Sequence, residues 1–479
     1  MPKPAPPVIV WFRRDLRLAD NPAVARAAAA GGPVIPLFIL DEGRPGPRPP
    51  GAASRWWLHH SLKSLAADLE NLGARLILRR GAASKVLDAL IAETGAGAVL
   101  WNRCHDKGST ERDAAIARDL QARGIRTECL DASLLFDPRE IRTKAGGWFK
   151  VYSPFWDACG AAGDPPPPVP APDTLAAPAV RPGSDALDDL TLTPRSPDWA
   201  AGFSDLWTPG AAGAAARLAR FLDGPVADYA DRRDFPGMPA ISGLSPHLAW
   251  GDIGPRQVRH AVMERAAAGE GREKFLKELA WREFAHHVMF HFPDLTDTPM
   301  DAKFRAFPWE PDDRLLTAWQ RGRTGYPIVD AGMRELWATG TMHNRVRMVA
   351  ASFLVKHLLQ PWQAGEAWFW DTLLDADPAS NPFNWQWVAG CGADAAPYFR
   401  IFNPVLQGGK FDGDGTYVRR WVSEVAALPK KYLHAPWTAP QDVLVDAGVT
   451  LGRDYPEPVV EHKWARDRAL AAFKSLRRD

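Results

Sequence analysis

The sequence predicts two different architectures in one chain: an N-terminal α/β domain with a doubly wound parallel sheet, and a C-terminal all-helical domain. Up to about residue 131, short apolar runs alternate with amphipathic stretches, which is typical of β-α-β units. From about residue 211 onward, the spacing of apolar residues is helical and strand signals are almost absent. We therefore divide the 479 residues into an α/β domain at 1–133, a long linker at 134–208 and a helical domain at 209–479.

Five apolar runs in the first domain are predicted to be buried strands. They are Val8–Phe12, Val34–Leu40, Arg75–Leu78, Ala98–Trp101 and Arg126–Leu130. Helices are expected between them at Ser54–Leu72, Ala82–Glu93 and Ser109–Ala122. Ser54 and Ser109 are predicted N-caps, and glycines should end these helices at Gly73, Gly95 and Gly124.

The linker contains a proline-rich run at 164–172, and we expect so long a connector to wrap over a surface. Beyond it, seven stretches have the clearest helical pattern. They are Ala211–Leu222, Pro255–Ala268, Arg272–Phe290, Leu315–Gln320, Pro327–Thr339, Arg345–Leu359 and Ala364–Leu373.

Composition is typical of a globular protein outside membranes, with 46% apolar and 24% charged residues. The net charge of +1 neither supports nor excludes a DNA partner, because only the surface that faces phosphates must be basic. No apolar run reaches the roughly 18 residues of a membrane span, and the N-terminus lacks a signal-peptide pattern. The four cysteines form no CxxC pair, so we expect no metal site, no disulfide framework and a cytoplasmic location.

Tryptophan is unusually frequent, with 21 residues, of which 14 follow residue 200. Such residues can fill a core or stack on flat ligands. Nucleotide motifs of the Walker A and GxGxxG types are absent. Instead, the chain carries VWFRRDLRL at 10–18, ELAWREF at 278–284, GYPIVD at 325–330, MHNRVRM at 342–348 and NWQW at 384–387, followed by a run from Asp394 to Pro404.

From about residue 8 to about residue 440, these motifs resemble the photolyase/cryptochrome family in order and spacing. The resemblance is strongest to the photolyases of cyclobutane pyrimidine dimers. The sequences RWWLHH at 55–60 and NPFNW at 381–385 are similar to the class III subgroup.

The resemblance implies FAD in the helical domain. It assigns the cofactor phosphates to Tyr229, Ser242, Leu244 and Ser245, and further cofactor contacts to Phe275, Arg282, Asn344, Arg347, Asp375, Asp377 and Asn381. Ile241 departs from the family pattern, in which many relatives have a hydroxyl residue. Without the resemblance, the turn before Pro246 would be interpreted as a helix cap, and the buried carboxylates and arginines as structural ion pairs.

Asn344 matches the position that faces flavin N5, where relatives that repair DNA carry asparagine. A neutral amide can hydrogen-bond N5 but is a poor proton donor, which favours a fully reduced flavin. In an unfamiliar sequence, the same residue would be interpreted as an exposed helix cap.

The resemblance also implies a pocket for a flipped-out lesion. Trp281 and Trp387 match its aromatic walls, Met348 its floor, and Glu278 the group that contacts the pyrimidine edge. Glu278 and Trp281 are three residues apart, so they share one side of a helix. Phe275 replaces a tryptophan that is common in close relatives and keeps an aromatic surface.

Electron transfer, DNA backbone contact and light harvesting have candidates on the same basis. Trp385, Trp362 and Trp309 match an electron-transfer chain, although each could simply be a core residue. Arg233, Arg345 and Arg400 match DNA-backbone positions, although arginines are usually solvated surface charges. Glu111 matches an acidic residue that contacts an antenna chromophore. The expected antenna is 5,10-methenyltetrahydrofolate, with 8-hydroxydeazaflavin or FMN as alternatives. Glu111 could also be a carboxylate that stabilises the first turn of a helix.

The expected function is light-dependent repair of cyclobutane pyrimidine dimers in DNA, by electron transfer from photoexcited reduced FAD. The alternatives are a cryptochrome-type blue-light photoreceptor and a (6-4) photolyase. Asn344 favours repair over signalling, and the sequence lacks the pair of histidines that (6-4) enzymes tend to carry near the lesion. We expect a monomer that binds damaged DNA, with no membrane and no obligate protein partner.

Overall fold

The computed structural model describes residues 5–41, 43, 46–395 and 399–476. Packing divides the chain into two units: unit 1 comprises 1–227 and 242–293, and unit 2 comprises 228–241 and 294–479. This division differs from the predicted one at residues 133 and 208. The reason is that the first helices of the predicted helical domain pack with the α/β part, a relationship that periodicity along the chain does not reveal.

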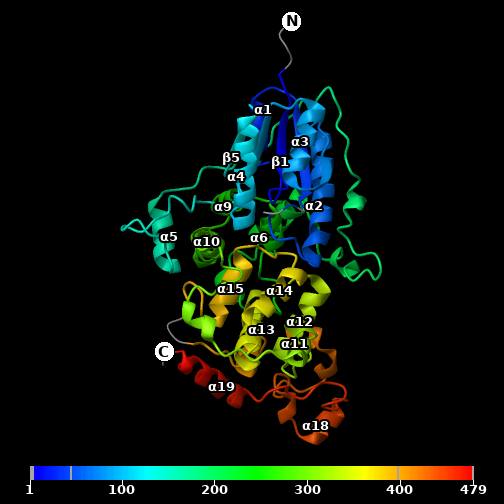
Figure 1. The fold of residues 1–479 in the computed structure, drawn as a ribbon. Helices are drawn as coiled ribbons and strands as arrows, with labels where there is room; N and C mark the ends of the chain where they lie inside the picture. The colour runs from blue at the N-terminus through cyan, green and yellow to red at the C-terminus, as the bar shows by residue number, and fades with distance from the viewer. Residues whose placement is uncertain (1–4, 42, 44–45, 396–398, 477–479) are drawn as a thin grey trace. The chain divides into compact units, whose positions relative to one another are not determined.

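Unit 1 contains a five-stranded parallel sheet of order β3-β2-β1-β4-β5, which confirms the predicted doubly wound fold (Figure 1). The strands are β1 Val8–Phe12, β2 Val34–Asp41, β3 Ile77–Gly81, β4 Ala98–Asn102 and β5 Arg126–Leu130. The prediction for β3 began two residues too early. Because β1 and β2 are almost completely buried, their sequences are continuous apolar runs, as parallel sheets covered on both faces require.

Four helices accompany the sheet: α1 Pro22–Ala29, α2 Ala52–Asn71, α3 Ala83–Thr94 and α4 Lys107–Ala122. Helices α3 and α4 share an apolar core with one face of the sheet. The predicted N-caps were wrong. Gly51 precedes α2, while Asp106 caps α4 by accepting the N–H of Ser109. Gly73, Gly95 and Gly124 have φ of +84°, +67° and +78°, which confirms the predicted helix ends.

The linker wraps along unit 1, as predicted, and exchanges backbone hydrogen bonds with it. Its Leu175 N–H bonds the Leu72 carbonyl, and the Ala176 carbonyl accepts from Val34. The linker also holds a helix that was not predicted, α5 Tyr152–Ala161, and two short 3-10 helices, η1 Leu187–Leu190 and η2 Ala201–Phe203. The α5 helix packs on α10, so tertiary contacts stabilise it.

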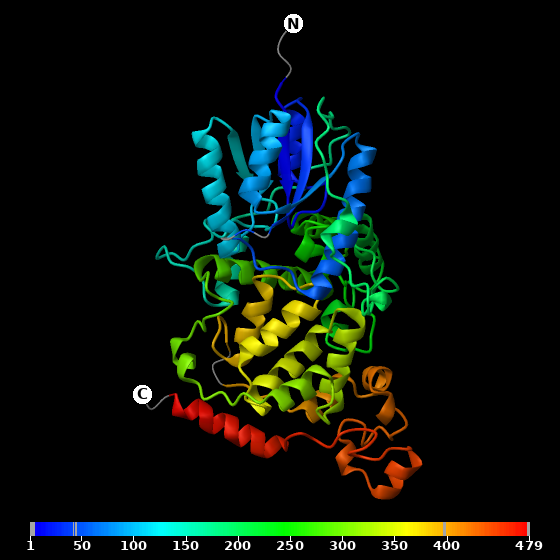
Figure 2. The ribbon, with the colours of Figure 1, turned by 45° about the vertical axis from the view of Figure 1, so that its right-hand side comes forward.

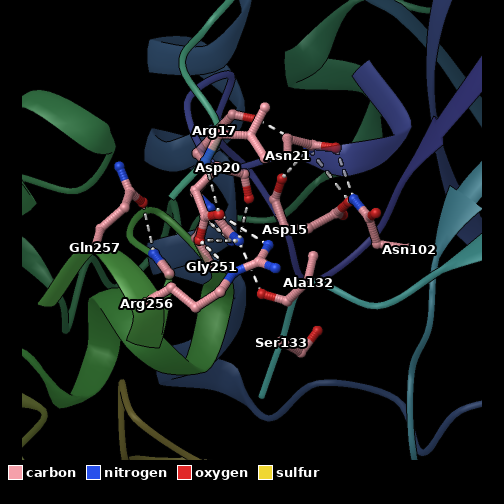
Figure 3. A network of polar contacts seen from close by, with 12 residues as sticks. Asp15, Arg17, Asp20, Asn21, Asn102, Ala132, Ser133, Gly251, Arg256 and Gln257 are labelled. Atoms are coloured by element: carbon pink, nitrogen blue, oxygen red, sulfur yellow. Dashed lines mark hydrogen bonds and ion pairs between the residues drawn. The ribbon is translucent and has the colours of Figure 1, made fainter. Parts of the chain in front are cut away.

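The remaining helices of unit 1 are α6 Ala211–Leu222, α8 Ser245–Trp250, α9 Pro255–Arg265 and α10 Glu270–His291. A buried polar network joins α9 and the end of α8 to the loop after β1 (Figure 3). Arg17, only 2% exposed, donates to the carbonyls of Gly251, Asp20 and Ala132 at 3.1, 2.7 and 3.0 Å. Asp20 also pairs with Arg256 at 2.8 Å. Gly251 has φ of +71°, and a Cβ there would lie 2.3 Å from the Arg14 carbonyl, so glycine is required.

Unit 2 is helical, and its central helices form a bundle in both views (Figures 1 and 2). Its α-helices are α7 Tyr229–Arg232, α11 Asp313–Gln320, α12 Pro327–Thr339, α13 Asn344–Ser352, α14 Trp362–Thr372, α15 Ser380–Ala389, α16 Pro404–Phe411, α17 Thr416–Trp421, α18 Gln441–Asp446 and α19 His462–Ser475. Its other helical turns are η3 Ala302–Ala306, the π-turn η4 Phe353–His357, η5 Ser423–Val425 and η6 Pro436–Thr438. The helix predicted at 345–359 is thus α13 continued by η4, and α15 was not predicted. Among the described residues, no helix is both long and apolar enough to cross a bilayer.

Candidate functional site

Helix α10 carries four of the predicted site residues. Phe275 is buried and packs on Phe221, with ring centroids 4.6 Å apart. Glu278 is partly exposed and lies 3.1 Å from Lys274. Trp281, also partly exposed, is stacked on Tyr152 of the linker, with centroids 3.8 Å apart and planes at 7°. The helix therefore holds a carboxylate one turn before an aromatic surface, as its sequence predicts.

Arg282 binds the last residue of the predicted α/β domain. Its guanidinium donates to the Ser133 carbonyl at 2.8 Å and pairs with Glu283 at 3.2 Å. The Glu283 carboxylate accepts the N–H groups of Leu135 and Phe136. Burial raises the pKa of Glu283, while Arg282 opposes that shift. These contacts connect α10 to the end of the α/β part, and the predicted flavin contact of Arg282 stays a prediction.

The predicted phosphate residues are distributed over both units. Ser242, Leu244 and Ser245 form the turn that begins α8, where Gly243 has φ of +64°. The Ser242 hydroxyl accepts the Leu244 N–H at 3.4 Å. Tyr229 belongs to unit 2, where it is buried and the Arg233 guanidinium lies 5.4 Å from its ring. Ile241, the departure from the family pattern, is 46% exposed.

In unit 2, Arg347 and Asp375 form an ion pair of 2.9 Å. Arg347 also donates to the Met342 carbonyl at 2.7 Å. The carboxylate has 5% of its side chain exposed, and its second oxygen, Oδ1, is buried with no hydrogen-bond partner in the described protein. A buried acceptor of this kind is costly unless a bound group donates to it. The residues therefore fit a ligand with polar N–H or O–H groups, such as a flavin nucleotide.

Asp377 and Asn381 organise the start of α15. The Asp377 carboxylate accepts the N–H groups of Ala379 and Ser380 at 3.0 and 2.7 Å. The Asn381 amide donates to the carbonyl and the carboxylate of Glu366 at 3.0 and 2.8 Å. Both residues thus hold α15 in place, and direct contact with a cofactor remains a prediction for each.

Asn344 is the first residue of α13, and His343 caps that helix by accepting the Arg345 N–H at 3.2 Å. Asn344 is exposed and Met348 is partly exposed. Their spacing of four residues puts them on one face of the helix. This face is available to a ligand, as the predicted roles of the two residues require.

The α15 helix carries both tryptophans of the NWQW motif. The Trp387 indole is partly exposed and donates to the Asp394 carbonyl at 3.0 Å, and the Arg400 guanidinium lies 6.0 Å from its ring. Residues 396–398 of the motif that runs from Asp394 to Pro404 lie outside the described residues. Asp394 and Arg400 are both described, so the setting of Trp387 is defined.

The three predicted relay tryptophans lie in the core of unit 2 or against it. Trp362 and Trp385 are buried, and Trp309 packs on Phe307 with centroids 4.3 Å apart. Trp385 also meets Trp319 edge-on at 6.2 Å, a neighbour that its sequence position did not single out. Their use as an electron relay stays a prediction.

Two predicted DNA-contacting arginines share a carboxylate. Arg345 pairs with Asp234 at 2.6 Å, and the Arg233 guanidinium lies 3.8 Å from the other oxygen of the same side chain. Arg345 also lies over the Phe411 ring at 4.4 Å. Asp234 was not among the predicted site residues. Its position directly after Arg233 was the feature of the sequence that could have indicated it.

Glu111 is exposed on α4, while the two residues that follow it are buried in an ion-pair network. Arg112 binds Asp41 and Asp113 at 2.8 and 2.7 Å, and Arg13 binds Asp113 at 3.0 Å. Both guanidiniums lie within 4.6 Å of the Trp11 ring. These side chains occupy the carboxyl ends of β1 and β2, and their interactions with one another account for their burial.

Comparison with known proteins identifies the family. Residues 8–173 match the family described as DNA photolyase, and residues 275–475 match the FAD binding domain of DNA photolyase. The chain belongs to the DNA photolyase family. It is 52% identical over 474 residues to a deoxyribodipyrimidine photo-lyase of Agrobacterium fabrum, with 98% of each chain covered.

Two further relatives show the range of the family. A crystal structure of a bacterial class III photolyase from Agrobacterium tumefaciens superposes with a TM-score of 0.97 at 52% identity, covering 100% of this chain and 99% of that one. Cryptochrome-1 of Arabidopsis thaliana is 40% identical, covering 98% of this chain and 70% of that protein. The predicted family and fold are confirmed.

Proposed function

We propose that the protein is a deoxyribodipyrimidine photo-lyase of class III, which repairs cyclobutane pyrimidine dimers in DNA with blue light. The photolyase relative at 52% identity over 98% of both chains carries this proposal. The exposed Asn344 at the start of α13 supports repair over a photoreceptor function. We further propose that it acts as a monomer in the cytoplasm.

The cofactor is FAD, which supplies the light-driven electron. In unit 1, Ser242, Leu244 and Ser245 offer hydroxyl and backbone groups to its phosphates. In unit 2, Tyr229 adds a phosphate contact, Asn344 offers an amide, and the Asp375 carboxylate offers the oxygen that has no hydrogen-bond partner among the described residues. The other cofactor contacts that we propose are Phe275, Arg282, Arg347, Asp377 and Asn381.

The chain's own part in repair is to bind and orient the lesion. Trp281 offers a stacking surface in unit 1 and Trp387 another in unit 2, each worth about 1–3 kcal/mol of base stacking. Glu278 accepts from or donates to the pyrimidine edge, and Met348 provides an apolar contact. Arg233, Arg345 and Arg400 contact phosphates without reading sequence, which suits an enzyme that must act in any sequence context.

Trp385, Trp362 and Trp309 are proposed to relay electrons to the cofactor from a reductant at the protein surface, because indoles are readily oxidised. Glu111 is proposed to contact an antenna, 5,10-methenyltetrahydrofolate being favoured over 8-hydroxydeazaflavin and FMN. Extraction of the purified protein followed by absorbance spectroscopy identifies the antenna directly.

The first test measures loss of a thymine dimer from an oligonucleotide by the purified, reduced holoprotein, with and without blue light. We expect light-dependent repair by the wild type. Trp281→Ala is expected to weaken dimer binding roughly 5- to 150-fold, because a stacking partner worth about 1–3 kcal/mol is lost. Trp337→Ala is the matched control, since Trp337 is an exposed tryptophan of unit 2 that is assigned no role. A protein that holds FAD but leaves the dimer intact, and repairs a (6-4) substrate instead, would contradict the proposal.

A second prediction concerns the carboxylate shared by Arg233 and Arg345. Asp234→Asn removes its negative charge, so we expect tighter binding of undamaged duplex DNA and a steeper salt dependence, by about one phosphate contact. Discrimination between damaged and undamaged DNA should fall accordingly. Binding titrations at several salt concentrations test this. Asp228→Asn is the control, because Asp228 pairs with Arg232 and both side chains are exposed. An unchanged salt slope in Asp234→Asn would rule out the shared-carboxylate role.

A further inference from the structure

The linker and α10 form an aromatic cluster around Trp281. Tyr152, the first residue of α5, is stacked on the Trp281 indole with nearly parallel rings, centroids 3.8 Å apart. Phe284 meets both rings edge-on, at 6.0 Å from Tyr152 and 5.9 Å from Trp281. The arrangement combines stacked and T-shaped contacts, both of which are favourable for aromatic pairs.

Tyr152 is also tied to the backbone beneath Trp281. Its hydroxyl donates to the Lys277 carbonyl at 2.8 Å. In an α-helix this carbonyl is the one that accepts the N–H of residue 281, so Tyr152 contacts both the ring of Trp281 and the turn that carries it. The tyrosine is 8% exposed, so these contacts are made in a largely dry environment.

The ionisation state of Tyr152 keeps its hydroxyl available as a hydrogen-bond donor. Burial raises the pKa of Tyr152, and the negative charge of Glu278 raises it further. The hydroxyl therefore stays protonated at neutral pH and keeps donating its hydrogen bond. Glu278, whose charge contributes to this shift, is the other residue of α10 that we propose to contact the lesion.

We propose that Tyr152 is a positioning residue for lesion recognition: it covers one face of the Trp281 indole and holds the ring so that its opposite face receives the flipped pyrimidine. This inference rests on the proposed function. A stacking surface is effective only if its rotamer is fixed before the ligand arrives, since otherwise binding must immobilise the side chain. Trp281 is partly exposed, and Tyr152 supplies packing that restricts it.

Two variants distinguish the contribution of the Tyr152 ring from that of its hydroxyl. Tyr152→Phe keeps the stacked ring and loses only the bond to Lys277. Tyr152→Leu keeps apolar volume but loses the stacking. We expect Tyr152→Leu to weaken dark binding of a dimer-containing oligonucleotide about tenfold, within the range of an aromatic stacking contact, and Tyr152→Phe to stay within about twofold.

The experiment uses the FAD-loaded protein in the dark and compares Kd for the dimer-containing oligonucleotide and its undamaged copy. We expect Tyr152→Leu to change only the first Kd, with FAD content unaltered. In single-turnover repair, the substrate concentration for half-maximal rate should rise while the rate at saturation changes little. Phe203→Leu is the control, because Phe203 is a buried aromatic residue of unit 1 that packs on Trp56 and Trp199.

Trp281→Ala is measured in parallel. If it loses dimer discrimination while Tyr152→Leu retains it, the positioning role is overturned and the proposed function stands. Equal weakening for damaged and undamaged DNA in Tyr152→Leu, or an equal loss in Phe203→Leu, would also overturn the role, since either indicates general loss of structure. If the wild type itself does not distinguish the two oligonucleotides, the proposed function fails.

Discussion

We expect Arg17→Met to lower the free energy of unfolding by at least about 3 kcal/mol, because three buried carbonyls lose their donor and each unsatisfied acceptor costs about 1–3 kcal/mol. Methionine retains much of the volume but leaves the carbonyls of Asp20, Ala132 and Gly251 without their donor (Figure 3). Arg17 is only 2% exposed, so water cannot replace those bonds without opening the structure. Asp20 would retain Arg256 as its ion-pair partner.

The measurement is urea unfolding followed by circular dichroism, comparing the midpoint of the first transition. Arg123→Met serves as the matched control, because Arg123 pairs with Asp88 and Asp119 in unit 1 but is 43% exposed. Exposed pairs contribute about 0–1 kcal/mol, so the control should shift little. Equal shifts in the two variants would show that burial of the Arg17 network adds no stability to unit 1 beyond that of an exposed ion pair.

The second large effect is expected at Asp375. Asp375→Asn should weaken FAD binding roughly 30- to 150-fold, which corresponds to about 2–3 kcal/mol. The asparagine can keep its oxygen toward Arg347, and its NH₂ then replaces the buried acceptor Oδ1. Alternatively, it can keep an acceptor at that position and lose the contact with Arg347. Either orientation leaves a buried group without a partner.

Flavin absorbance after dialysis, and titration of the apoprotein with FAD, measure this loss without reference to repair. Glu424→Gln provides the control within unit 2. Glu424 forms a similar partly buried pair with Arg334, with contacts of 2.8 and 2.9 Å, and is assigned no contact with the cofactor. Normal FAD retention in Asp375→Asn would exclude this carboxylate from the cofactor site.

Much of the fold could be predicted because the relevant signals are local. The strands of the parallel sheet are buried on both faces, so their sequences are continuous apolar runs such as VIVWF at β1. Helices α6 and α12 have the predicted bounds, since their apolar periodicity is regular. The N-cap predictions at Ser54 and Ser109 failed because the residue that caps a helix depends on backbone geometry several residues earlier.

Short helices such as α5 and α15 were not predicted from the sequence. The proline at residue 154 of α5 and the mixed polar and aromatic sequence of α15 obscure helical periodicity. Tertiary contacts stabilise both. Tyr152 packs on Trp281, and Asp377 caps α15 through its first N–H groups.

The sequence by itself determined the family, the doubly wound sheet and the helical second half, because these are carried by motifs and periodicity along the chain; the site residues that it names stay predictions. Only the tertiary structure revealed which partners those residues have. Arg282 binds the Ser133 carbonyl, Trp281 stacks on Tyr152, and Arg345 pairs with Asp234. The members of each pair are more than 100 residues apart in sequence, and contacts at such separations depend on how elements pack, which no local pattern encodes.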